Sequence, residues 1–175
     1  MKIQFSSNNK IKHLPKTLIG LALASAIGSV QADAFNRIAT WSVKNNLPSK
    51  VSVTTETSAE IITASKDGNT LIYSDSPLGG LGFIDIKNPN TPKAAGFLAL
   101  DGEPTSVSTT QKYALTGVNT SENYLKPSGK LSVIDLKTHQ EVRSCDLGGQ
   151  PDSVAVSKDE TFVAIAIENE RDEDL

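Results

Sequence analysis

The six residues Leu-Gly-Phe-Ile-Asp-Ile at Leu81–Ile86 decide the fold, because they return as Leu-Ser-Val-Ile-Asp-Leu at Leu131–Leu136. A second stretch, Gly-Glu-Pro-Thr-Ser-Val at Gly102–Val107, returns as Gly-Gln-Pro-Asp-Ser-Val at Gly149–Val154. The first pair runs from position 81 to position 131, an offset of 50, and the second from 102 to 149, an offset of 47. A period of roughly 46 residues is typical of one four-stranded propeller blade, which needs neighbours to bury its faces.

The sequence after the leader has the pattern of an all-β protein. Short β-branched runs alternate with clusters of Gly, Pro, Asn and Asp, and helical periodicity is absent. We predict a partial β-propeller of about two and a half four-stranded blades, with blades over residues 59–101, 102–148 and, in part, 149–175. The expected strands are Ala59–Ala64, Thr70–Ser74, Gly82–Lys87, Ala94–Leu100, Thr105–Thr109, Tyr113–Val118, Lys130–Leu136, Glu141–Leu147, Asp152–Ser157 and Thr161–Ile167.

Residues 33–58 precede the first blade, and Phe35–Val43 within them reads as a further strand. Propellers usually need roughly four to eight blades to close their ring. We therefore expect the chain to be the N-terminal portion of a longer protein, or to be completed by a partner. Whether the 175 residues are a natural product or fold alone, and in what oligomeric state, stays open at this point.

Residues 1–32 have the character of a secretory signal peptide. Four lysines and no acidic residue accompany an apolar run over Thr17–Val30, and Val30-Gln31-Ala32 offers small side chains for cleavage. Removing this segment takes the formal net charge from −3 to −7. The sequence thus predicts an exported protein, periplasmic or extracellular, with no membrane span after cleavage and no nucleic-acid partner.

Several segments carry a resemblance to bacterial exported phytase-like, esterase-like β-propeller proteins, over the N-terminal portion of that family's length. They are Asn36–Thr40, Ala59–Ile62, Asp67–Pro77, Gly102–Val107, Gly149–Val156 and Ile167–Leu175. The individual blade motifs are also similar to YVTN-type propeller repeats. The resemblance implies a phosphoester hydrolase in the full-length protein, with a small phosphoester ligand, whereas this portion alone is expected to be inactive. The alternative is a non-catalytic YVTN-type propeller that acts as a binding or scaffold module.

Acidic and amide side chains recur where strands end, and they form the predicted site. In propellers of this strand order the loops that enter a blade and the loops between its second and third strands emerge on one face, which places Glu103 and Asp152 near the candidate ligands. Oxygen ligands at a channel mouth suit Ca²⁺, which could clamp a phosphate ester. The candidate cation ligands are Asp75, Asn119, Glu168, Glu170 and Asp172.

The alternative for these residues is ordinary turn chemistry, because Asp and Asn make local hydrogen bonds and stay solvated in turns. Other catalytic groups are scarce. Cys145, the single cysteine, is expected to be a buried, inert thiol, and no internal disulfide is possible. His139, the one histidine beyond the leader, is expected to be a solvated turn residue, so the sequence predicts no Ser-His-Asp triad. The catalytic residues of the parent stay unknown.

Overall fold

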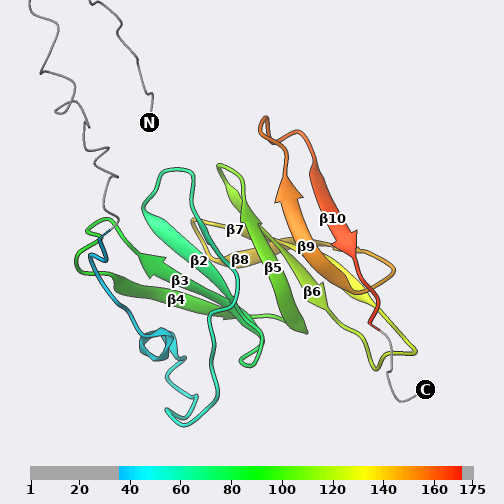
Figure 1. Cartoon of the computed structure of the whole chain (residues 1–175), viewed down its shortest axis with the longest axis horizontal. Helices are drawn as coiled ribbons and strands as arrows, with labels where there is room; N and C mark the ends of the chain where they lie inside the picture. Colours follow the sequence, from blue (N-terminus) through cyan, green and yellow to red (C-terminus); the bar gives the residue numbers. More distant parts are fainter. Residues whose placement is uncertain (1–35, 171–175) are drawn as a thin grey trace, which may run out of the picture. The chain divides into compact units, whose positions relative to one another are not determined.

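The computed structural model describes residues 36–170, in which the chain from Arg37 onward clusters as one unit. Its strands form three antiparallel sheets in which each strand pairs with the next along the chain (Figure 1). Blade one contains β1 (Ile62–Ala64), β2 (Thr70–Asp75), β3 (Gly80–Asp85) and β4 (Lys93–Ala99). Blade two contains β5 (Glu103–Thr109), β6 (Tyr113–Asn119), β7 (Gly129–Asp135) and β8 (Gln140–Asp146). Blade three consists of β9 (Pro151–Val156) and β10 (Val163–Ile167).

The fold confirms the prediction of an all-β chain with two and a half blades. The main difference in strand bounds concerns β1, which begins at Ile62 rather than at Ala59. Ahead of it the pairing is irregular, because the Ser74 carbonyl accepts the N–H of Glu60 at 3.1 Å and the Ser74 hydroxyl accepts that of Ile61 at 3.1 Å. The predicted signal peptide, residues 1–32, lies outside the described residues. Within residues 36–170 we find no helix with the length and apolar character of a membrane span.

The strand predicted over Phe35–Val43 is wrong in its described part. Residues 37–42 have no regular structure, and Val43–Asn46 form a short 3-10 helix, η1. The physical reason is Asn46, which is buried and docks this segment on blade one. Its Nδ2 donates to the Phe83 carbonyl at 2.8 Å and to the Tyr73 hydroxyl at 3.3 Å. The segment before blade one therefore ends in a turn that places the Asn46 side chain in the blade, and its described part does not form the predicted strand.

The core lies between successive blades and is built from the repeated segments. Between blades one and two, buried apolar side chains of both sheets meet in one cluster. A second cluster joins blades two and three, where Leu115 and Leu131 pack against Val154. Full burial of such a side chain stabilises the fold by about 1.5–3 kcal/mol. The first cluster consists of Ile72, Leu81, Phe83, Val107, Ala114 and Ile134.

The structure of blade two corrects the predictions for Cys145 and His139. Cys145 is exposed, not buried, because β8 is the outermost strand and all of its residues are exposed. His139 is half-buried rather than solvated, since its ring stacks on Phe83 of blade one with centroids 3.8 Å apart. Burial lowers the pKa of His139, with Asp135 acting in the opposite direction. This histidine is therefore a packing residue at the first interface between blades.

Candidate functional site

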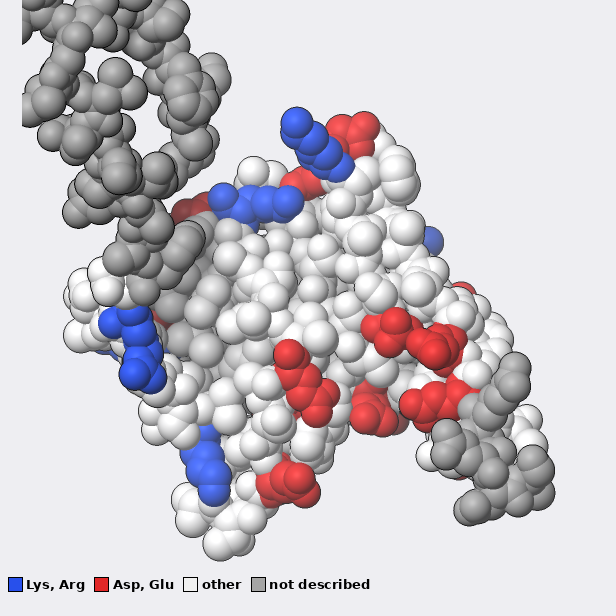
Figure 2. Space-filling view, viewed as in Figure 1, with Lys and Arg blue, Asp and Glu red and all other residues white. Residues whose placement is uncertain are grey.

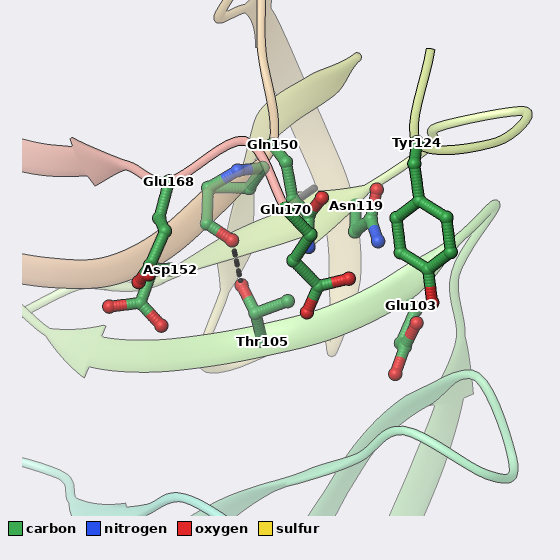
Figure 3. A pocket seen from close by; sticks show the side chains of 9 residues that line it. Glu103, Thr105, Asn119, Tyr124, Gln150, Asp152, Glu168 and Glu170 are labelled. Atoms are coloured by element: carbon green, nitrogen blue, oxygen red, sulfur yellow. Dashed lines mark hydrogen bonds between the residues drawn. The ribbon is translucent and has the colours of Figure 1, made fainter. Parts of the chain in front are cut away.

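A cavity of about 450 Å³ opens at the end of the sheets where blades two and three adjoin (Figure 3). Strand β5 begins there at Glu103 and β6 ends there at Asn119, and these two residues pair directly in the ladder. Strand β9 begins and β10 ends at the same edge. These strand ends therefore meet at one cavity. The cavity is lined by Glu103, Thr105, Asn119, Tyr124, Gln150, Pro151, Asp152, Glu168 and Glu170.

Two buried prolines accept hydroxyl groups that link successive blades, and one of them, Pro151, lines this cavity. The hydroxyl of Thr105 in blade two donates to the carbonyl of Pro151 in blade three at 2.8 Å (Figure 3). One blade earlier, the hydroxyl of Ser76 donates to the carbonyl of Pro104 at 2.9 Å. Both prolines are fully buried, and each occupies the same place in the repeated Gly-x-Pro segment. The repeated hydroxyl-to-proline link therefore sets the spacing of successive blades at this end.

The far wall of the cavity is held by Gln150. Its backbone N–H donates to Oδ1 of Asn169 at 3.0 Å, and its carbonyl accepts the N–H of Glu168 at 2.9 Å. The chain beyond β10 therefore runs back along the loop that enters blade three. This pairing keeps the side chains of Glu168 and Glu170 on the cavity, where the sequence predicted them.

The cavity is strongly acidic. Four of its lining residues carry carboxylates, all of them exposed to solvent, and none of the lining residues is Lys, Arg or His. Figure 2 shows acidic side chains gathered along the lower edge of this face, while most basic ones lie along other edges. Asn119 also lines the cavity, but its Oδ1 already accepts the N–H of Ser121 at 2.9 Å, which leaves its amide nitrogen toward the site. The electrostatics therefore favour a cation.

Asp75 does not belong to this site. Its side chain is fully buried at the end of β2 and does not line the cavity. Its carboxylate accepts the backbone N–H of Ser58 at 3.0 Å and of Leu78 at 3.2 Å, and the hydroxyl of Thr57. These three donors occupy its oxygens and fasten the segment before β1. These contacts give Asp75 a structural role, and they set it apart from the candidate ligands that line the cavity.

Three of the four remaining candidate ligands line the cavity. Asp172 lies outside the described residues, whereas Asn119, Glu168 and Glu170 line the cavity together with Glu103 and Asp152. Among residues 36–170, no three His, Cys, Asp or Glu side chains gather closely enough to hold one metal ion. In Figure 3 Asp152 and Glu168 lie to one side and Glu103 to the other. The described carboxylates surround a space rather than converge on a point, so alone they do not form a Ca²⁺ shell.

His139 lies apart from this cavity, since it packs at the interface between blades one and two. The hydroxyl of Thr105 lines the cavity but is committed to the Pro151 carbonyl. Glu103 and Asp152, which the sequence placed here without listing them as ligands, prove to be equal members of the acidic lining. Tyr124, on the loop between β6 and β7, was not predicted as a site residue. No local sequence signal distinguishes it, because its position depends on the path of that loop.

Comparison with known proteins gives one family match. The family model described as the choice-of-anchor I domain matches residues 60–174, which covers all of the strands described above. No curated protein matches the chain.

Solved structures show likeness at the level of the fold. Hydrazine synthase from Kuenenia stuttgartiensis is 24% identical with a TM-score of 0.51, over 62% of this chain and 29% of that chain. A functionally unknown protein from Desulfotomaculum acetoxidans is 11% identical with a TM-score of 0.48, over 61% of this chain and 32% of its own. The chain thus spans about a third or less of these structures' length, and the first likeness concerns the fold alone.

Proposed function

Because the chain belongs to the choice-of-anchor I domain family, we propose that it is a non-catalytic binding module of an exported surface protein. In this proposal the acidic cavity between blades two and three holds a cationic ligand. The observation that carries it is the composition of the lining, in which Glu103, Asp152, Glu168 and Glu170 face one cavity without a basic lining residue. The family name, which refers to anchoring, agrees with export and with the leader predicted from the sequence.

An amine or guanidinium of a partner fits this cavity better than a bare metal ion. The carboxylates surround a space of about 450 Å³ and do not meet at one point, so each can accept a hydrogen bond from a separate N–H donor. Tyr124 adds an aromatic ring at the mouth, where a cation can lie against its face. The proposed ligand is therefore an oligoamine or a basic segment of a partner protein.

Calcium remains the second candidate, because Glu168 and Glu170, two of the cation ligands proposed from the sequence, line the cavity. A Ca²⁺ shell of roughly six to eight oxygens would need further ligands, and Asp172 would be one of them. Phosphoester hydrolysis, which the phytase-like resemblance implies, stays a prediction for a longer parent protein.

The test is calorimetric titration of the chain with spermidine and, separately, with CaCl2, at constant ionic strength. We expect saturable spermidine binding that falls at least about tenfold in a Glu168→Gln, Glu170→Gln double variant, because two charge-assisted hydrogen bonds are lost. Tight Ca²⁺ binding with no spermidine binding would select the metal instead.

The matched control is Glu56→Gln, which removes one exposed carboxylate outside the cavity. Binding should be unchanged in this variant. A loss of binding free energy in the control about half that of the double variant would mean that the ligand responds to net charge alone, because the double variant removes two charges and the control one, and the proposed site would then be wrong.

A further inference from the structure

A second cavity, of about 320 Å³, lies at the opposite end of the strands, between turns of blades one and two. It is lined from three turns, because Lys66 belongs to the β1–β2 turn, Lys112 to the β5–β6 turn and Lys137 to the β7–β8 turn. Figure 1 shows the β1–β2, β5–β6 and β9–β10 turns along one edge of the unit. Three ammonium groups brought together by separate turns make this end basic, in contrast to the acidic cavity.

One carboxylate, that of Asp67, also lines the basic cavity, but its oxygens have partners of their own. It accepts the Ser65 hydroxyl at 2.6 Å and the side-chain and backbone N–H groups of Asn69 at 2.9 and 3.0 Å. These bonds hold the side chain within its turn. The three lysines therefore keep a net positive charge toward the cavity.

The rim of the basic cavity already binds a carboxylate from the chain itself. Glu160, on the β9–β10 turn of blade three, accepts the backbone N–H of Gln111 with both of its oxygens, at 3.0 and 3.1 Å. One of these oxygens lies 3.9 Å from Nζ of Lys66. A backbone donor and an ammonium group thus hold an oxyanion here, in the arrangement that a bound phosphate or sulfate would use.

Lys112 is restrained in a way that suits a ligand-binding role. Its ammonium group lies 5.0 Å from the centre of the Tyr113 ring, which limits the rotamers of an otherwise exposed side chain. The neighbouring backbone donors are engaged, since the Thr110 hydroxyl accepts the N–H groups of Lys112 and Tyr113. The turn is therefore shaped before any ligand arrives, and the free donors that remain are ammonium groups.

We propose that this cavity is a binding site for small tetrahedral oxyanions, with Lys112 and Lys137 as its main ligands and Lys66 shared with Glu160. The Glu160 carboxylate occupies the adjoining rim and repels an incoming anion. Removing its charge should therefore raise the affinity, whereas removing either free lysine should lower it. Comparison with a lysine elsewhere on the surface separates a specific site from a general response to charge.

The experiment follows amide chemical shifts of the chain while inorganic phosphate or sodium sulfate is added at constant ionic strength. We expect saturable shifts at Gln111, Lys112 and Lys137. Lys112→Gln and Lys137→Gln should each weaken binding about two- to fivefold, and Glu160→Gln should strengthen it by a similar factor. Sulfate and phosphate acting alike would indicate a general oxyanion site, and a preference for phosphate would point to a phosphoester ligand.

The matched control is Lys50→Gln, which removes one exposed positive charge away from the cavity. It should leave the affinity unchanged. The proposal would be overturned by non-saturable shifts, by equal effects of Lys50→Gln and Lys112→Gln, or by shifts that sodium chloride reproduces at the same ionic strength. Because the acidic cavity lies at the other end of the strands, its variants should not change these results.

Discussion

The carboxylate of Glu160 in blade three accepts the backbone N–H of Gln111 in blade two, at 3.0 and 3.1 Å. Glu160 reaches this position with a φ of 58°, in the left-handed region that glycine favours. In the corresponding turn of blade one Gly68 has a φ of 71°. The chain therefore accepts backbone strain in blade three and gains a link between blades in return.

Substitutions at Glu160 should separate these two effects. Glu160→Ala keeps the strained φ and loses the link, and we expect it to destabilise the chain by about 1–2 kcal/mol. Glu160→Gly also loses the link but relieves the strain, so it should be more stable than the alanine variant by about 1 kcal/mol. Urea unfolding measures both. An alanine variant at least as stable as the glycine variant would contradict the account.

Tyr73 and Gly82 form a size-matched pair in blade one, where they lie opposite each other in neighbouring strands. A Cβ on Gly82 would stand 2.0 Å from the Tyr73 ring, so Gly82→Ala should destabilise the chain by about 1–3 kcal/mol or more. Blade two carries Thr116 opposite Ser132 at the equivalent place.

The blade-two pair supplies the control for this prediction. Tyr73→Thr combined with Gly82→Ser transfers that pair to blade one, and its cost should be smaller than the sum of the two single costs. Thermal unfolding of the four proteins measures the coupling. Strict additivity would show that the ring and the glycine are not matched to each other.

Asp67 predicts a dependence of stability on acid pH. The hydroxyl of Ser65 and the N–H groups of Asn69 lower its pKa from 3.8 to about 2. Since the pKa is depressed in the folded state, this stabilisation is complete above about pH 4 and is lost as the pH falls toward about 2. Asp67→Asn should therefore flatten the loss of stability over that interval.

Asp67→Asn should reduce the loss of stability at acid pH only in part, because Asp159 makes equivalent bonds in blade three. The hydroxyls of Ser157 and Thr161 likewise lower the pKa of Asp159. Carboxyl carbon shifts followed by NMR give the midpoint directly, and a midpoint near 3.8 for Asp67 would contradict the assignment.

The repeats were sufficient to predict the blades, because a period of roughly 46 residues is typical of a blade with four strands. They also placed Asn119, Glu168 and Glu170 at one cavity, since equivalent positions in successive blades fall at one edge. Asp75 occupies an equivalent place in sequence but a different environment. Its burial depends on Thr57 and Ser58, which fold over it from the irregular segment before β1.

The remaining errors have the same origin in tertiary contacts. The alternation around Cys145 resembles a buried strand, but β8 is outermost and has no neighbour to cover it. His139 has the sequence context of a solvated turn, yet Phe83 of the preceding blade lies against its ring. The segment around Asn46 turns because a buried carbonyl in blade one needs its amide. None of these partners is adjacent in sequence, so local patterns could not reveal them.

The measurement that tests the central claim most directly is a map of amide chemical shifts as spermidine is added to the chain. The account predicts saturable shifts confined to the acidic cavity, at Glu103, Asp152, Glu168 and Glu170, with no change at Lys112 or Lys137. Saturable shifts elsewhere, or no shifts at a constant physiological ionic strength, would contradict the claim that this cavity is the binding site of the module.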